Sequence, residues 1–377
     1  MKRAIALAGG GPACGLQIGA LKRLEQAGIS FDVWALSCIG AWVGAIYNQF
    51  EPGARAARTE DLFRNVIFRD DVSYSRFPIN RVFGPDLQSN ATALIQFLGD
   101  PNSYRNLVLP GHILDTMRRN VEFVQDPRRW NHGDFNALVL ENLAANPISR
   151  FLTSMIFLSE VNGLSRIYYP GSSFLASIDF KKLSEPDQPY MYHNAWNLSR
   201  QKLQLFSNRP LAERHGHTPG RYKQLTAESV CACSALPYIE QTVKIDGDTY
   251  CEGALVDTVN FKDLLEDHKD LDEVWVVRIV DDNQIRAPRD LTDGLGNLCM
   301  LFAATVGEDD VKLFKHHLER RKKNKERLPR LVELSVSPAI NYDWNHSNLD
   351  RGIQAGYEAA EEALQQYAQK DQDGFSP

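Results

Sequence analysis

The chain has 377 residues, of which 43% are hydrophobic and 24% are charged, with a formal net charge of −6. This composition predicts an ordinary soluble protein with a large core, and its negative charge argues against nucleic acid as the main partner. The six cysteines are too sparse for a disulfide framework, which favours a cytoplasmic location. No apolar run approaches the ~18 residues of a membrane span.

The chain begins with a predicted unit of two strands and one helix. An apolar strand covers residues 4–8 and leads into a glycine-rich loop that starts with Gly9–Gly11. A helix over residues 16–27 follows, with apolar residues along one face, and a second apolar strand covers residues 33–36. This order is typical of a right-handed βαβ unit in a parallel sheet.

The second strand runs into a sharp turn and then into an apolar helix. Such a turn presents one side chain above the sheet, as in the nucleophile elbow G-x-S-x-G. Here Cys38 occupies the nucleophile position, and Leu36 stands in place of the first glycine. Two interpretations of Cys38 stay open. It is either a buried small hydrophobic residue, or a catalytic thiolate whose pKa is lowered by the helix N-terminus.

The run Gly9–Gly11 has three alternative uses. Glycines allow backbone amides to face an anion, so the loop could bind phosphate or stabilise an oxyanion, or it could be a tight turn. The loop lacks the Lys-Ser/Thr pair of a Walker motif and the G-x-G-x-x-G of a dinucleotide fold, which argues against phosphate. Its position one βα unit before the elbow favours oxyanion stabilisation.

The middle of the chain is predicted less sharply. Pro and Gly recur along residues 50–185, and the range is rich in aromatic side chains. Such an irregular segment fits a lid or cap over an elongated apolar pocket. An ordinary helical layer on the sheet is an equal alternative. His215 and His217 lie in a Gly/Pro loop without enough further ligands for a metal, so we expect neither a metal nor another cofactor.

The second half of the chain contains further predicted elements. Its basic stretch Lys312–Arg330 reads as a solvated helix face, with a peripheral contact to anionic lipid or an acidic carrier as the alternative. The remaining elements are strands at 190–194 and 202–207, a helix at 225–233, a hairpin at 243–251, and strands at 273–280 and 331–336. An amphipathic C-terminal helix follows, with Ile353, Tyr357, Ala360, Leu364 and Tyr367 on one face. A disordered tail is expected from about residue 370.

Four stretches occur in a characteristic order: Gly9–Gly11, residues 36–41, Cys231-Ala-Cys-Ser-Ala-Leu-Pro237 and Tyr250-Cys-Glu-Gly-Ala254. Together they resemble the patatin-like phospholipase family, which has a glycine-rich oxyanion loop, a G-x-S-x-G-A elbow, an A-S-x-A-x-P segment and a D-G-G/A motif. The resemblance implies a three-layer α/β/α fold with a mostly parallel central sheet. It also implies an α/β domain over 1–340, with the cap inserted at about 50–185, and a C-terminal helix and tail over 341–377.

The resemblance also implies roles for particular residues. Cys38 would be the nucleophile and Glu252 its base, although the family has serine and aspartate at these positions. The amides of Gly10, Gly11 and Ile39 would form the oxyanion hole. Asp257 is a second carboxylate that could act as the base instead of Glu252.

A cysteine nucleophile suggests a particular chemistry. It gives a thioester intermediate, which favours acyl transfer or hydrolysis on a lipid-like or polyketide-like acyl ester or thioester, including one bound to CoA or a carrier protein. A nearby carboxylate, however, favours the protonated thiol. Two alternatives stay open: a catalytically silent protein of this fold that binds an acyl ligand or a partner, and a condensing enzyme that forms carbon–carbon bonds.

Overall fold

The computed structural model describes residues 1–85, 87–105, 107–158, 162–167, 172–209, 221–261, 264–278, 285, 287–289, 291–334, 336 and 340–372. The chain divides into two compact units. The first unit consists of residues 1–84 and 165–377, and the second of residues 85–164. The chain passes between them at the short strands β3 (Gly84–Pro85) and β4 (Gly163–Arg166).

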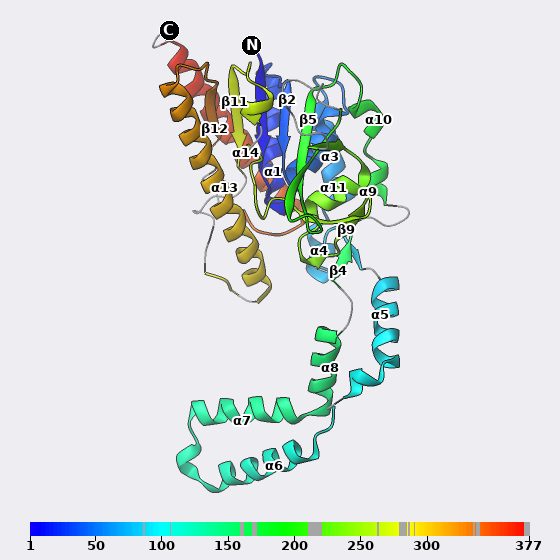
Figure 1. The fold of residues 1–377 in the computed structure, drawn as a ribbon. Coiled ribbons are helices and arrows are strands. Elements are labelled where there is room, and N and C mark those ends of the chain that lie inside the picture. Colours follow the sequence, from blue (N-terminus) through cyan, green and yellow to red (C-terminus); the bar gives the residue numbers. More distant parts are fainter. Residues whose placement is uncertain are drawn as a thin grey trace. The chain divides into compact units, whose positions relative to one another are not determined.

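The first unit is built on a sheet with the strand order β12-β11-β1-β2-β5-β10-β9, and β6 and β7 extend it from β5 (Figure 1). The five strands from β12 to β5 are parallel, whereas β10 and β6 each run antiparallel to β5. The strands are β1 (Arg3–Leu7), β2 (Val33–Leu36), β5 (Tyr190–Asn197), β6 (Lys202–Ser207), β7 (Tyr222–Gln224), β9 (Val243–Ile245), β10 (Asp248–Glu252), β11 (Glu273–Val277) and β12 (Arg330–Leu334).

Alternation of side chains along the central strands creates two cores. Ile5 and Leu7 of β1 face one core, together with residues of α1, α2 and α14. Ala4 and Ala6 face the other core, which contains residues of α12 and α13. Because both faces of these parallel strands are covered, their sequences are almost continuously apolar. The predicted three-layer α/β/α fold with a mostly parallel sheet is therefore confirmed.

Of the helices of the first unit, α1, α2, α11 and α14 lie where the sequence predicted helices, and the basic end of α13 was predicted as a helix face. The π-turn η2 (Phe63–Ile67) and a short strand β8 (Tyr238–Glu240) complete this unit. The helices are the 3-10 helix η1 (Gly11–Cys14), α1 (Gly15–Gln26), α2 (Ile39–Asn48), α3 (Arg55–Leu62), α4 (Asp71–Arg76), α9 (Ser173–Ala176), α10 (Phe180–Leu183), α11 (Ala227–Ser234), α12 (Leu264–Asp267), α13 (Leu291–Lys323) and α14 (His346–Gln372).

The C-terminal helix α14 packs closely on α1. A Cβ atom at Gly19 would lie 1.9 Å from the carbonyl oxygen of Ile353, and one at Gly356 would lie 1.9 Å from that of Leu16. Only glycine allows the two backbones to approach this closely. The helix that the sequence placed outside the α/β domain is thus part of the first unit, and residues 373–377 of the predicted tail lie outside the described residues.

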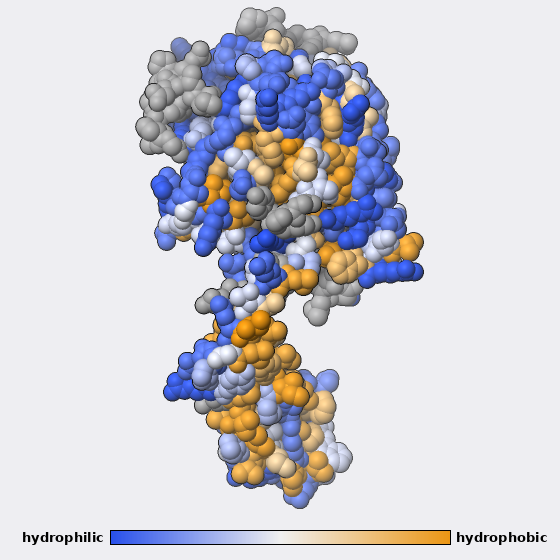
Figure 2. Space-filling view, turned by 90° about the vertical axis from the view of Figure 1, so that its right-hand side faces the viewer, coloured by the Kyte–Doolittle hydropathy of each residue, from blue (hydrophilic) through white to orange (hydrophobic). Residues whose placement is uncertain are grey.

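The second unit is helical and exposes many apolar side chains, seen as orange over much of its surface in Figure 2. Along α6, Leu114, Met117, Val121 and Val124 are all more than half exposed. The helices are α5 (Leu87–Gly99), η3 (Pro101–Tyr104), α6 (Pro110–Gln125), η4 (Pro127–Arg129), α7 (His132–Ala145) and α8 (Pro147–Leu158). This unit lies within residues 50–185, and a lid function for that range stays a prediction.

No helix of the described residues has an apolar stretch long enough to cross a membrane.

Candidate active site

The elbow at Cys38 has the geometry that the sequence predicted. Cys38 joins β2 to α2 with φ 49° and ψ −123°, a conformation that is strained for a residue with a side chain. A Cβ atom at Gly40 would lie 2.3 Å from the carbonyl oxygen of Leu7. The last glycine of the elbow is therefore needed to bring the start of α2 against β1.

Leu36, which replaces the first glycine of the family motif, is accommodated by another glycine. Its side chain is fully buried, and a Cβ atom at Gly44 would lie 2.7 Å from both of its terminal carbons. Gly44 is in the second turn of α2, so the helix offers room for the larger side chain. The departure at Leu36 is thus absorbed by packing.

The glycine loop lies beside the elbow. A Cβ atom at Gly9 would be 3.1 Å from that of Cys38 and 3.0 Å from that of Ala254. The amide of Gly9 already donates to the carbonyl of Thr258 at 3.2 Å. Gly10 and Gly11 follow with φ values of 155° and 55°. On the other side of Cys38, the backbone amide of Ile39 is near enough to lower the pKa of the thiol.

Glu252 reaches the same place from β10. It is the last residue of that strand, and its amide donates to the carbonyl of Ala235 at 3.0 Å, which ties it to the segment 231–237. The next residue, Gly253, passes so close to β5 that a Cβ atom there would lie 2.7 Å from Oδ1 of Asn194. The carboxyl group of Glu252 and the thiol of Cys38 lie close enough for each to shift the pKa of the other.

Asp257, the alternative base, is engaged elsewhere. Its Oδ1 accepts a hydrogen bond from the amide of Asn260 at 2.7 Å. Its carbonyl oxygen accepts from Oγ of Ser37 at 3.2 Å and from Nδ2 of Asn194 at 2.7 Å. Its backbone therefore supports the residue before Cys38, and its carboxylate caps the turn to Asn260.

The electrostatics of the pair differ from the expectation of a preformed thiolate. Burial raises the pKa of Cys38 well above its usual value, and the negative charge of Glu252 raises it further, while the Ile39 amide lowers it by less. Burial raises the pKa of Glu252 to about 7, although the interaction with Cys38 opposes this. The resting site thus holds a neutral thiol beside a carboxyl group that titrates near neutral pH.

Other groups near the pair were not predicted as site residues from the sequence. The thiol of Cys233 donates to the carbonyl of Cys38 at 3.3 Å. Glu240 is buried, and burial together with the charge of Glu252 raises its pKa. Tyr342 and Cys299 are also within electrostatic reach of Glu252. They come from distant parts of the chain, and no local pattern marks them.

The buried His193 does not join the pair. His193 is fully buried, its Nε2 lies 3.0 Å from Oγ of Ser229, and its ring stacks on Phe206. Burial lowers its pKa to about 4, so it is neutral. His215 and His217 lie outside the described residues. In the part of the chain that is described, no three His, Cys, Asp or Glu side chains are grouped to hold a metal.

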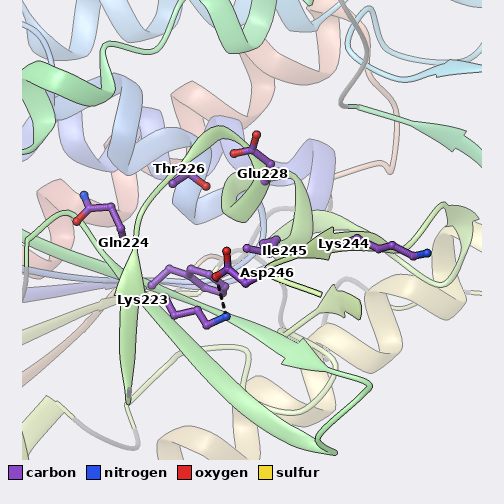
Figure 3. A pocket seen from close by; sticks show the side chains of 8 residues that line it. Lys223, Gln224, Thr226, Glu228, Lys244, Ile245 and Asp246 are labelled. Atoms are coloured by element: carbon purple, nitrogen blue, oxygen red, sulfur yellow. Dashed lines mark hydrogen bonds and ion pairs between the residues drawn. The ribbon is translucent and has the colours of Figure 1, made fainter. Parts of the chain in front are cut away.

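A separate cavity of about 400 Å³ lies at the N-terminal end of α11, whereas Cys38 lies near its C-terminal end (Figure 3). Lys223 and Asp246 form an ion pair of 3.1 Å in it. Most of its lining residues are polar or charged, and Cys38 is not among them. The elongated apolar pocket ending at Cys38 stays a prediction. The cavity is lined by Phe206, Lys223, Gln224, Thr226, Glu228, Lys244, Ile245 and Asp246.

The basic stretch Lys312–Arg330 forms the end of α13 and the connection to β12. Several of its cations are paired within the protein: Lys312 with Glu308 and Lys315 with Glu333. A contact of this stretch with lipid or an acidic carrier stays a prediction.

Comparison with known proteins shows similarity to a family and to solved structures. A family model described as patatin-like phospholipase matches residues 5–265. The structure titled "Crystal structure of VipD from Legionella pneumophila" aligns with a TM-score of 0.41 and 12% sequence identity, covering 97% of this chain and 67% of that chain. Among curated proteins, none matches the sequence.

Proposed function

The chain belongs to the patatin-like phospholipase family, a family of lipid acyl hydrolases, and from this we propose that it cleaves an acyl ester or thioester through an S-acyl intermediate on Cys38. One observation carries the proposal: the thiol of Cys38, at a strained turn beside the glycine loop, lies close enough to the carboxyl group of Glu252 for each to shift the pKa of the other. This proximity supports a mechanism with Cys38 as nucleophile, Glu252 as base and the amides of the loop as candidate oxyanion donors.

In the first half of the reaction, ionised Glu252 takes the proton of the Cys38 thiol as sulfur attacks the acyl carbonyl carbon. A carbon–sulfur bond forms and the carbonyl π electrons move to oxygen. The amides of Gly10, Gly11 and Ile39 are the candidate donors to that oxyanion. When the oxyanion collapses, the bond to the leaving alkoxide or thiolate breaks, and Glu252 returns the proton to the leaving group.

In the second half, an acceptor attacks the thioester on Cys38. Glu252 takes a proton from water, and carbonyl collapse releases the fatty acid and the Cys38 thiolate, which recovers its proton. A thiol or amine in place of water would give acyl transfer instead. Because thioesters exchange readily with such acceptors, a cysteine at this position makes transfer to a second substrate part of the proposal.

This chemistry does not need a thiolate in the resting site. The raised pKa of Cys38 means that its proton leaves in step with attack, as for a serine nucleophile. Glu252, with a pKa of about 7, is half ionised at neutral pH and can accept this proton and give it back. The pair therefore works like the family's Ser-Asp dyad with a softer nucleophile.

The burial of Cys38, which is only 8% exposed, favours a second candidate function. A buried neutral thiol reacts slowly when no base assists it. In that case the chain would be a silent member of the family that binds an acyl ligand without cleaving it.

The deciding experiment is intact-protein mass spectrometry after incubation with glycerophospholipids, p-nitrophenyl esters and acyl-CoA thioesters. We expect an added acyl mass on the peptide that contains Cys38, and its absence in Cys38→Ala. The control variant Cys14→Ala removes another buried thiol and should acylate as the parent does. Ligand binding without acylation would support the silent candidate. Analysis of the released products then separates hydrolysis from transfer and from condensation.

A further inference from the structure

Tyr342 lies against the glycine loop. A Cβ atom at Gly11 would be 2.7 Å from the hydroxyl oxygen of Tyr342 and 2.9 Å from the ring carbon that bears it. Any side chain at position 11 would therefore collide with the phenol. The same glycine that gives the loop its positive φ also admits the Tyr342 hydroxyl to the edge of the candidate oxyanion hole.

The side chain of Tyr342 also packs against α13. A Cβ atom at Gly296 would be 3.0 Å from the Cβ of Tyr342. One helical turn later, the side chain of Cys299 lies near the Tyr342 hydroxyl, which lowers the pKa of this cysteine. The phenol is thus clamped between α13 and the glycine loop, and it is only partly buried.

The backbone around Tyr342 is held by Asn348 of α14. Its Nδ2 donates to the carbonyl oxygens of Asn341 at 2.7 Å and Asp343 at 2.9 Å, and its Oδ1 accepts from the amide of Asn341 at 3.1 Å. Asn348 is fully buried. The residues on both sides of Tyr342 are therefore anchored to the helix that packs on α1, the helix that follows the glycine loop.

We propose that Tyr342 is a further catalytic residue, whose hydroxyl donates a hydrogen bond to the acyl carbonyl oxygen when that oxygen becomes negative. This inference rests on the proposed function and deepens it. No proton is transferred from the phenol. During attack the hydroxyl donates to the oxyanion, and this hydrogen bond weakens again when the oxyanion collapses.

The surroundings favour a neutral donor. Burial raises the pKa of Tyr342 well above its usual value, and any negative charge on the neighbouring Cys299, Cys38, Glu252 or Glu240 raises it further, so the hydroxyl keeps its proton. In a site where acidic groups surround the reacting atoms, a neutral O–H and backbone amides are the groups that stabilise the oxyanion. Tyr342 lies beyond residues 5–265, the part matched by the family model.

The test uses a long-chain trifluoromethyl ketone, whose fluorine atoms give the NMR signal that is followed. Cys38 adds to its carbonyl carbon to give a hemithioketal, whose oxyanion pKa is read by fluorine NMR across a pH titration. In Tyr342→Phe we expect this pKa to rise by about one to two units and the acylation rate to fall by about 100-fold, as for loss of one oxyanion donor. The control Tyr357→Phe loses only a surface hydrogen bond to Gln26 and should match the parent.

The outcomes separate this inference from the proposed function. An adduct that titrates alike in the parent and in Tyr342→Phe would overturn the role of Tyr342 and leave the Cys38 mechanism standing. A parent protein that forms no adduct on Cys38 would overturn both. Thermal unfolding of Tyr342→Phe checks the fold, and a shift of the oxyanion pKa in a variant that melts like the parent supports the proposal.

Discussion

The thiol of Cys38 and the carboxyl group of Glu252 lie close together in a place where both are more than nine-tenths buried. Each changes the pKa of the other: the charge of Glu252 raises the pKa of Cys38, and the interaction with Cys38 lowers that of Glu252. A Cys-His pair does the opposite, because an imidazolium stabilises the thiolate. In the proposed mechanism, Cys38 takes the place of the family's serine in a dyad that works by removing a proton from a neutral group.

Replacing Cys38 by serine restores the atom usual in the family, yet we expect it to lower turnover. A serine oxygen is on a shorter bond and would be set back from Glu252 and from the acyl carbon. An error of ~1 Å in the position of a reacting atom can cost about 100-fold. Turnover and acyl-enzyme mass are measured for Cys38→Ser, with Cys38→Ala as the variant that should form no acyl-enzyme. A Cys38→Ser protein faster than the parent would contradict the prediction.

Replacing Glu252 by glutamine should have opposite effects on turnover and on alkylation. Turnover should fall about 100-fold or more, since the thiol loses its base. Alkylation of Cys38 by iodoacetamide should become faster, because removing the negative charge lowers the thiol pKa. Peptide mapping is needed here, as the partly buried Cys299 can also react.

The pH profile identifies the base. Glu252 must be ionised to accept a proton, so kcat/KM of the parent should rise with pH through about 7. This rise of kcat/KM with pH should disappear in Glu252→Gln. It should persist in Asp257→Asn, because an amide oxygen can still accept from Asn260. If the rise of kcat/KM with pH is lost in Asp257→Asn and kept in Glu252→Gln, the assignment of the base would be reversed.

The raised pKa of Glu252 also has a cost in stability. In the unfolded chain the carboxyl group ionises above its ordinary pKa of 4.5, whereas in the folded protein it stays protonated up to about 7. The contribution of Glu252 to the free energy of unfolding is therefore fully present below pH 4.5. It falls by about 3 kcal/mol in total as the pH rises to about 7. Urea unfolding from pH 4.5 to 8 should show the free energy of unfolding of the parent falling relative to that of Glu252→Gln. A constant difference across this range would contradict the shift.

Local patterns predicted those parts of the fold that depend on neighbours in sequence. Strand β2, the elbow and the hairpin β9-β10 were predicted because apolar runs, a sharp strand-to-helix turn and an Asp-Gly turn determine them within a few residues. The close placement of Glu252 and Cys38 followed from motif order in the family. The compensation of Leu36 by Gly44 could not be predicted, because it depends on how α2 packs against β2.

Tyr342 could not be predicted for a similar reason. Its approach to Gly11 depends on α14, which brings the residues before it to the glycine loop, and on Gly296 of α13. No spacing in sequence connects these positions. The helices α1 and α14 each have a pair of glycines four residues apart, which is a sequence signal of close helix packing: Gly15 and Gly19 in α1, and Gly352 and Gly356 in α14. The prediction of the C-terminal helix rested on its apolar stripe and did not use these glycines.

The contact between α1 and α14 gives a last prediction, which links stability to the site. Replacing Gly19 by alanine puts a Cβ atom 1.9 Å from the carbonyl oxygen of Ile353 and 2.8 Å from the amide nitrogen of Tyr357. Both are backbone atoms of α14, so they cannot move aside as a flexible side chain can, and the two helices must separate. Overpacking of this kind costs about 1–3 kcal/mol or more.

The matched control is Gly294→Ala in α13, where the nearest atom to the new Cβ is 3.7 Å away. Because alanine is favoured over glycine within a helix by about 1 kcal/mol, this variant should be neutral or slightly stabilised. Thermal unfolding should therefore shift in opposite directions for the two variants. Since α14 carries Asn348, which anchors the residues beside Tyr342, Gly19→Ala should also lose turnover at temperatures where it is still folded. Turnover that follows only the folded fraction of Gly19→Ala would show that helix packing stabilises the chain without positioning the tyrosine.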